Sequence, residues 1–404
     1  MIGLLTRSTN VGEALENQIK VALGLSGVEI IHQEEIGTGA IRLVVAQRER
    51  SAVCPVCDRV TTKVHDTRAR VKADQPLGDQ FVSLVVLRRR FACSRCPGTF
   101  TEDDPTCGRR RRLTRRLRTR LGRDSVHQTV QQVARSYGVS PATVRWAQAE
   151  YAEQQVEAAP APLTQLGIDE HSVRKGCRYA TGLHDVTRRR LFEVVEGRTS
   201  AVLQAALEKL PTPETIKVVS MDMSGAFRAA VEAVLPHAAI VADKFHVIAR
   251  ITEAVRDVWR RLLRGKRRDD PLRRTGRGVL RGREHLSLEE EATLRGVLRS
   301  YPALRRAWLL KEDFRRWYRA ASAATARLEL RAWRRMIVDL PDLPEMPALE
   351  GMLNRWQEEI LNYFTFRVTQ GPVEGHNHRA KVIQRRAYGY RSFPNYRRRL
   401  LLAG

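Results

Sequence analysis

Three acidic residues, each in a distinctive local setting, constrain this chain more than any other feature. Asp169 ends the largely apolar run at residues 165–168, and Asp222 ends the run at 218–221. Such runs are typical of buried central strands that deliver an acid to their carboxyl end. Glu374 lies just inside a predicted helix, because Pro372 suits the first helical position, where a missing N–H costs nothing.

A single acid of this kind is more often a helix cap or a surface residue, so the prediction depends on all three together. Hard cations such as Mg²⁺ prefer carboxylate oxygens and keep open positions for water and phosphate. Two such ions roughly 4 Å apart activate an attacking oxygen and stabilise a leaving one. The face of the third acid also carries Asn377, His378 and Lys381. The pattern predicts metal-assisted phosphoryl transfer on DNA.

The charge balance indicates a polyanionic partner. Lys and Arg total 71 against 45 Asp and Glu, which gives a formal net charge of +26 and a pI near 10.7. Such a surplus favours nucleic acid over an acidic small molecule. Membrane binding is the rival interpretation, but no apolar run approaches the roughly 20 residues that span a bilayer. The first residues also lack a secretory pattern, so we expect a cytoplasmic, nucleoid-associated bacterial protein.

Two CxxC pairs predict a structural metal site near the N-terminus. The alternating strand at residues 81–87 lies between the pairs, so a hairpin must separate the two knuckles. Four thiolates in two knuckles close a tetrahedral Zn²⁺ site. Free buried cysteines and a redox pair are the alternatives. The four predicted ligands are Cys54, Cys57, Cys93 and Cys96.

Arginines dominate the segment after Gly108, in which Leu113, Leu117 and Leu121 recur every four residues. This spacing predicts a helix with one apolar stripe and a basic remainder, which would lie along a phosphate backbone. A basic face that is merely solvated is the alternative. The arginines of this segment that we expect to contact phosphate are Arg109, Arg110, Arg112 and Arg116.

Residues 129–146 have the pattern of a helix-turn-helix. Gly138 occupies the turn, Ser140 is the predicted N-cap and Pro141 is the first residue of the second helix. Thr143 and Arg145 then face a DNA groove. Two helices about a glycine turn also occur in ordinary helical proteins, so the adjacent arginine-rich helix is what favours DNA binding.

The region after residue 163 is predicted to be a mixed sheet. We expect strands at 164–169, 177–186, 190–196, 216–222 and 239–243, with helices at 200–210 and 224–235. Three strands followed by alternating helix and strand is the order of an RNase H-like sheet. From residue 245 to about 370 the pattern is helical and charged, which indicates an insertion before the third acid.

The expected fold class is therefore α/β and multidomain, which suits a chain of 404 residues with 43% hydrophobic content. An RNase H-like catalytic domain with a long helical insertion follows a zinc-binding β module and a helix-turn-helix. The predicted boundaries are 1–107 for the β module, 108–158 for the basic helix and helix-turn-helix, 159–248 for the first part of the catalytic core, 249–370 for the insertion, and 371–404 for the C-terminal helix with the third acid.

The order of these motifs resembles that of bacterial insertion-sequence transposases of the ISL-three group. Besides the CxxC module and the helix-turn-helix, the resemblance rests on IDE at 168–170, VSMD at 219–222, ADKFHV at 242–247, GPVEGHN at 371–377 and RRAYGY at 385–390. It spans about residues 28–400. It implies a DDE transposase that uses Mg²⁺ or Mn²⁺ to hydrolyse DNA at transposon ends and to join the freed 3′ hydroxyl to target DNA.

By position, the resemblance assigns Asp169, Asp222 and Glu374 as the three catalytic acids and as the ligands of the catalytic metal. Gln370 stands where the family usually has Asn. Both side chains donate and accept hydrogen bonds, so this departure affects local contacts more than catalysis.

Four further residues are predicted to support the site: Asp243, His246, Asn377 and His378. The first two belong to a family block whose role stays open. Asp243 follows another predicted strand, so it either assists metal binding or caps the following helix.

The implied partners are the terminal inverted repeats and the target DNA, together with further copies of the chain in a homodimer or larger oligomer. Near the third acid, Lys381 and Arg385 are predicted to contact phosphates. Two other functions stay open. One is a DNA-binding regulator derived from a transposase, in which the acids are vestigial, and the other is a metal-dependent nuclease that cuts DNA without joining it.

Overall fold

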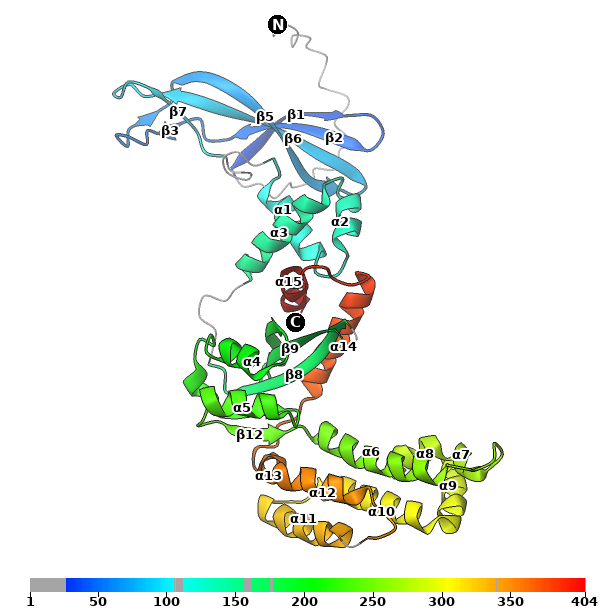
Figure 1. Ribbon diagram of the computed structural model, residues 1–404. Coiled ribbons are helices and arrows are strands. Elements are labelled where there is room, and N and C mark those ends of the chain that lie inside the picture. The colour runs from blue at the N-terminus through cyan, green and yellow to red at the C-terminus, as the bar shows by residue number, and fades with distance from the viewer. Residues whose placement is uncertain are drawn as a thin grey trace. The chain divides into compact units, whose positions relative to one another are not determined.

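The computed structural model describes residues 27–104, 106, 112–155, 162–174, 177–338 and 340–403. The chain divides into two compact units, Met1–Val156 and Glu157–Gly404 (Figure 1). Sheets and helices occur in both units, which confirms the mixed α/β class. Arg109 and Arg110, two of the predicted phosphate contacts, lie outside the described residues.

A five-stranded sheet forms most of the first unit, with the order β1-β2-β6-β5 and with β7 paired to the end of β6. β2 and β6 pair in parallel, whereas β5 and β6 form a long antiparallel hairpin. Alternate residues of β2 and β6 are buried, because successive side chains of a strand point to opposite faces. The bounds are β1 Val28–Glu35, β2 Ala40–Gln47, β5 Val64–Leu77, β6 Gln80–Ala92 and β7 Thr99–Thr101.

Three helices follow in the first unit, α1 Arg115–Asp124, α2 Val130–Ser136 and α3 Pro141–Gln154. Each begins after a hydroxyl residue whose side chain accepts a hydrogen bond from the N–H three residues later, which satisfies one free donor of the first turn. Gly138 has φ +61° in the turn between α2 and α3, a conformation that favours glycine. The shared core contains Leu117, Leu121, Val133, Ala134, Val144 and Ala147.

The second unit is built on a mixed sheet with the order β10-β9-β8-β11-β12. β8, β9 and β10 pair antiparallel, whereas β11 pairs in parallel with both β8 and β12. Parallel neighbours need crossover connections, and helices α4 and α5 supply them. The bounds are β8 Gln165–Arg174, β9 Arg178–Asp185, β10 Arg190–Glu196, α4 Ser200–Leu207, β11 Val218–Met221, α5 Gly225–Val234 and β12 Ala239–Ala242.

Different helices cover the two faces of this sheet. Leu166 and Ile168 point into the large core that also contains α4 and α5. The intervening residues of β8 point to the other face, where α14 Gly371–Arg386 and α15 Phe393–Ala403 pack. A Cβ added to Gly167 would lie 2.8 Å from Cγ2 of Val373, so the absence of a side chain there lets α14 approach β8 closely. The helix that carries the third acid therefore lies on the face opposite the main core.

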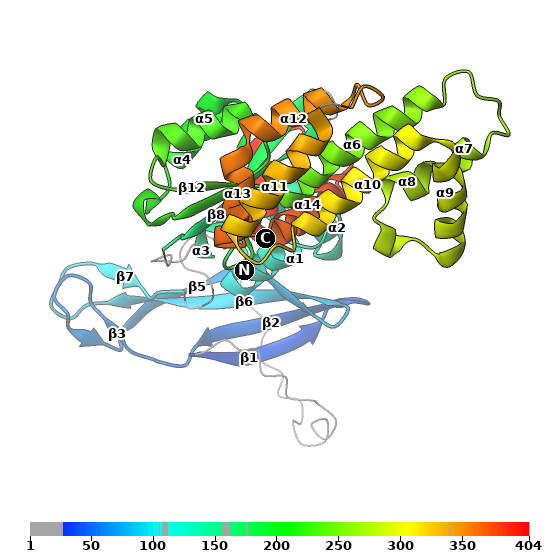
Figure 2. The ribbon, with the colours of Figure 1, turned by 90° about the horizontal axis from the view of Figure 1, so that it is seen from below.

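A helical body follows β12 and returns to the sheet (Figure 2). α6 starts at the end of β12, and α7 to α9 gather at its far end. α13 returns along β12, where Nδ2 of Asn362 donates to the carbonyl oxygen of Ile240 at 2.8 Å. The bounds are α6 Lys244–Leu262, α7 Pro271–Arg274, α8 Gly276–Leu280, α9 Leu288–Ser300, α10 Pro302–Trp317, α11 Ala323–Val338, α12 Met346–Arg355 and α13 Gln357–Phe366.

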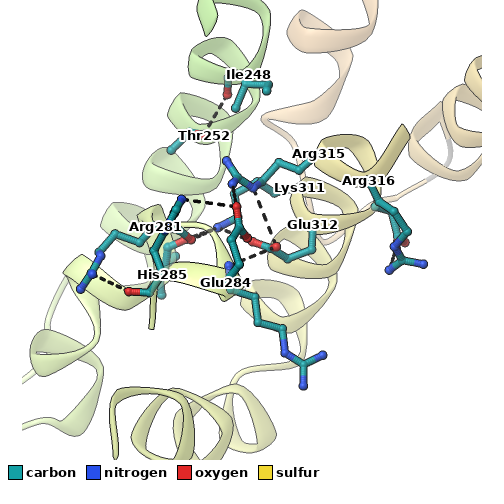
Figure 3. Close-up of polar contacts among 12 residues, drawn as sticks. Ile248, Thr252, Arg281, Glu284, His285, Lys311, Glu312, Arg315 and Arg316 are labelled. Atoms are coloured by element: carbon teal, nitrogen blue, oxygen red, sulfur yellow. Dashed lines mark hydrogen bonds and ion pairs between the residues drawn. The ribbon is translucent and has the colours of Figure 1, made fainter. Parts of the chain in front are cut away.

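A buried lysine ties two of these helices together (Figure 3). Nζ of Lys311, on α10, donates to the carbonyl oxygens of Val279 and Arg281 at 2.8 and 2.5 Å, and thereby satisfies free acceptors at the end of α8. Oε1 of Glu312 lies 2.8 Å from the same nitrogen. Burial nevertheless lowers the pKa of Lys311. Within the described residues, no helix is both long enough and apolar enough to cross a membrane.

Candidate functional site

Three aspartates lie at one level of three neighbouring parallel strands. Met221 of β11 pairs with Ile168 of β8 on one side and with Ala242 of β12 on the other. The next residue is an aspartate on all three strands, namely Asp169, Asp222 and Asp243. Because equivalent residues of paired parallel strands project to the same face, the register gathers three carboxylates in a row.

The expectation that Asp169 ends its strand was wrong. β8 continues to Arg174, because its antiparallel pairing with β9 extends past the point where β11 stops at Met221. Asp222 does follow the last residue of its strand, as expected. Pairing with β9 therefore fixes the backbone of Asp169 on one side. On its other side, β11 has already ended at Met221.

His246 joins the second and third aspartates. Its Nδ1 lies 2.7 Å from Oδ1 of Asp222 and 2.7 Å from Oδ2 of Asp243. One ligand atom from each of these three residues lies within 4.8 Å of the others. Hydrogen bonding of the imidazole to the carboxylate of Asp222, and then to that of Asp243, raises the pKa of His246 to about 10, so the imidazole is cationic at neutral pH.

Asp243 performs the capping role that the sequence left open, and it also reaches the site. Its Oδ1 accepts a hydrogen bond from the N–H of Phe245 at 3.2 Å, which makes it the N-cap of α6. Its other oxygen contacts His246. The side chain is 5% exposed, so this carboxylate is held firmly between the helix and its imidazole partner.

Asp169 is connected to α14 by an amide. Nδ2 of Asn377 donates to Oδ2 of Asp169, while the N–H of Glu170 donates to Oδ1 at 2.7 Å. Burial and then the charge of Asp222 raise the pKa of Asp169 to about 7. Gln370 also contacts β8, because its Nε2 donates to the carbonyl oxygen of Ile168 at 3.4 Å. Asn377 thus does lie at the site, and Gln370 fixes the start of its helix.

Glu374 lies apart from the aspartates. Its side chain is 63% exposed, and its Oε1 is 3.9 Å from Nε2 of His378, which is 72% exposed. Among the described residues, no group of mutually close metal-ligand atoms combines Glu374 with Asp169 and Asp222. Lys381 and Arg385, further along the same helix, are exposed as well.

Buried histidines beneath α14 were not anticipated. Nδ1 of His184, on β9, lies 3.2 Å from Nδ1 of His376, and Nε2 of His171 lies 2.9 Å from the hydroxyl of Tyr396. Burial lowers the pKa of His184 to about 3 and that of His171 to about 4, so both are neutral. The alternation of apolar and polar residues in β8 and β9 was the available signal that these side chains face the helix side of the sheet.

The four predicted cysteine ligands come together in the first unit. The strands β3 Ala52–Val53 and β4 Val60–Thr61 flank the first pair, and the second pair lies between β6 and β7. Their sulfur atoms lie within 4.8 Å of one another, and Sγ of Cys57 is 3.6 Å from Sγ of Cys93. The sulfurs of a tetrahedral zinc site stand about 3.8 Å apart, given the usual Zn–S distance.

Backbone geometry prepares one of these thiols for metal binding. Sγ of Cys93 accepts hydrogen bonds from the N–H groups of Cys96 and Arg95, both at 3.4 Å. These bonds lower the pKa of Cys93 to about 6, which favours the thiolate. The donor set and spacing fit Zn²⁺, which binds thiolates rather than thiols.

The predicted DNA contacts of the first unit differ in their surroundings. Arg112 and Arg145 are exposed, whereas Thr143 is half-buried and its hydroxyl lies 2.9 Å from Oγ of Ser140. Arg116 instead forms an ion pair with Asp74, whose side chain is fully buried. Its guanidinium is therefore engaged within the unit.

Comparison with known proteins places the chain in a family. The sequence profile of the family described as "Transposase", the DDE transposases of the ISL3 (ISL-three) group, matches residues 166–400. This chain belongs to the ISL3-group DDE transposases. The matched part of the transposase begins in β8 and ends in α15, so it contains all three aspartates of the row, His246 and Glu374.

Two relatives carry corresponding names. The transposase is 29% identical over 373 residues to the "Transposase for insertion sequence element IS1001" of Bordetella parapertussis. This alignment covers 90% of the present chain and 92% of the relative. It is 26% identical over 260 residues to the "Transposase for insertion sequence element IS1557" of Mycobacterium tuberculosis, which covers 57% of this chain and 58% of that relative. The first alignment is too long to be confined to the second unit, so it includes part of the first.

Proposed function

We propose that this chain binds the ends of an insertion sequence and catalyses cleavage of DNA and transfer of the cut strand to a target. The proposal depends mainly on the aligned row of Asp169, Asp222 and Asp243. This row concentrates negative charge on one face of the sheet. The strand order, with three antiparallel strands followed by two parallel ones, supports the proposal of an RNase H-like domain. Family membership supports the same reaction.

Asp169, Asp222 and Glu374 are the proposed catalytic acids and the ligands of Mg²⁺ or Mn²⁺. Carboxylate oxygens are the donors that such ions prefer, and the aspartates are crowded enough that the pKa of Asp169 rises. When bound, the ions activate the attacking oxygen and stabilise the leaving one. Glu374 lies three residues before Asn377 on the same helix, so α14 is joined to Asp169 about one turn from Glu374. Glu374 itself must approach the aspartates to share a metal with them.

Basic residues on α14 are positioned to hold DNA beside these acids. Lys381 and Arg385 are exposed on the same helix as Glu374, and we propose that they bind phosphates. Each neutralised phosphate releases counterions, so binding weakens steeply with salt. The net charge of +26 fits a large electrostatic share of the affinity.

The first unit is proposed to recognise the transposon ends. α2 and α3, joined by the Gly138 turn, have the proportions of a helix-turn-helix, with Arg145 exposed on the second helix to contact bases and Arg112 exposed before α1 to contact phosphate. The cysteine cluster holds a structural Zn²⁺ in this proposal. The transposase would work as a homodimer or larger oligomer on DNA in the bacterial cytoplasm.

An Asp222→Ala variant tests the proposal. We expect it to retain specific binding to end DNA in a gel-shift assay, because Asp222 belongs to the acid row rather than to the predicted DNA contacts. We expect Mg²⁺-dependent cleavage to fall by a factor on the order of 1000 or more, as for loss of other catalytic groups.

An Asp269→Ala variant is the matched control, because this acid is 79% exposed and lies outside the acid row. Equal cleavage by the Asp222→Ala and wild-type proteins would refute the catalytic assignment. Cleavage without any joined product would instead identify a nuclease.

A further inference from the structure

We propose that Asp222, Asp243 and His246 form a divalent-cation position that takes Mn²⁺ in preference to Mg²⁺ and that fills before DNA binds, without Glu374. The inference rests on the proposed function for its place in catalysis, but the binding itself is independent of it. It adds two ligands, Asp243 and His246, to the three acids assigned above.

Geometry distinguishes this group from the expected triad. The three ligand atoms already lie within 4.8 Å of one another, and Nδ1 of His246 is 2.7 Å from an oxygen of each aspartate. Ligands of an octahedral ion with bonds near 2.1 Å stand about 3 Å apart when adjacent and about 4.2 Å apart when opposite. An ion at the meeting point of these atoms therefore requires only small side-chain movements, whereas Glu374 must first approach.

The backbone holds the two aspartates at this separation. Asp222 follows Met221 and Asp243 follows Ala242, and these preceding residues are paired neighbours of β11 and β12. The pairing continues one step further, because the N–H of Asp243 donates to the carbonyl oxygen of Met221 at 2.8 Å. The position is thus formed by the fold itself and does not depend on a flexible loop.

The positive end of α6 repels a cation, and Asp243 reduces this repulsion. The positive end of the helix dipole lies at Asp243. Oδ1 of Asp243 neutralises that end by accepting from the N–H of Phe245, which leaves Oδ2 directed at the ion position. We therefore expect the cation to bind reversibly rather than as a permanently held ion.

The donor set decides which cation is preferred. Mg²⁺ favours oxygen ligands and gives up its waters reluctantly. First-row transition ions accept an imidazole nitrogen, and Mn²⁺ accepts it together with carboxylates. Nδ1 of His246 already lies 2.7 Å from an oxygen of each aspartate, so one nitrogen and two oxygens face the same position.

Mn²⁺ binding to the intact protein without DNA tests the proposal, with one zinc per chain for the cysteine cluster and all excess zinc removed. Free Mn²⁺ is measured by its electron paramagnetic resonance signal for the wild type, Asp243→Asn, His246→Asn and Glu374→Gln. Asparagine caps a helix as well as aspartate does, so Asp243→Asn removes the charged ligand and keeps α6 capped.

We expect Asp243→Asn and His246→Asn to weaken binding by about tenfold or more, and Glu374→Gln to change it less than twofold. Competition with Mg²⁺ should show a Mn²⁺ preference that His246→Asn reduces. Equal weakening by Glu374→Gln, or unchanged binding by Asp243→Asn, would overturn the proposal.

The outcome separates the two proposals. If the wild type cleaves end DNA but Asp243→Asn binds Mn²⁺ normally, the cation position is wrong and the transposase function stands. If Mn²⁺ binds as described but the wild type cleaves no DNA, the proposed function fails while the cation position stands.

Discussion

The cysteine cluster of the first unit and the aspartate row of the second are assembled in different ways. The four sulfurs come from two short turns and are already mutually close. The aspartates come from three strands separated by helices, and the third proposed acid, Glu374, remains 63% exposed on α14. Local turns gather the cysteines, whereas the aspartates meet only through the pairing of strands that are distant in the sequence.

Loss of one clustered cysteine is expected to have the largest effect on stability, and it should distinguish the first unit from the second. Cys57→Ser should lower the zinc content and destabilise the first unit by several kcal/mol, because metal binding contributes directly to folding. Elemental analysis and limited proteolysis of the intact chain measure the two effects. Cys177→Ser is the control, because this exposed thiol lies outside the cluster. Unchanged zinc in Cys57→Ser would refute the metal assignment, and Mn²⁺ binding in the second unit should persist.

The aspartate row is expected to make the stability of the second unit depend on pH. Burial and Asp222 raise the pKa of Asp169 to about 7. A raised folded-state pKa means that the stability contributed by this group is fully present below about pH 4 and is lost as the pH rises through 7. The loss amounts to roughly 4 kcal/mol at most.

Urea unfolding of the second unit at pH 5 and pH 8, without added Mg²⁺ or Mn²⁺, measures this loss. Asp169→Asn should flatten the pH dependence between these values. An identical slope in the variant and the wild type would contradict the assignment.

The smallest expected effect concerns the approach of α14 to the sheet. Gly167→Ala places a methyl group 2.8 Å from Cγ2 of Val373, and we expect it to cost about 1–3 kcal/mol of stability. Val373→Ala in the same chain should recover part of this cost, because it removes the opposing methyl groups. Thermal unfolding of the single and double variants checks the pair. Additive destabilisation would show that the two residues do not oppose each other.

The same contrast explains what the sequence could predict. The CxxC pairs predict all four cysteines of the cluster, because each pair lies in a local turn. The sequence also singles out Asp169 and Asp222, because each follows an apolar run. It does not predict that both align with Asp243, because that alignment depends on the register between strands that are far apart in the sequence.

Long-range partners account for the remaining differences. Arg116 looked like a free basic residue, but Asp74 lies 42 positions earlier and becomes its partner only through folding. The contact between His184 and His376 joins residues 192 positions apart. The spacing of these residues along the sequence predicts neither pair. The buried partner determines which contact the other residue makes.

α6 begins directly after its N-cap Asp243 and runs for 19 residues toward the helices α7 to α9. A helix of that length is a rod of about 28 Å. His246 lies about 24 Å from the far end, so a tilt of 5° about that end would displace it by roughly 2 Å relative to Asp222 at the end of β11. A rigid tilt of α6 would therefore change the distance between His246 and Asp222.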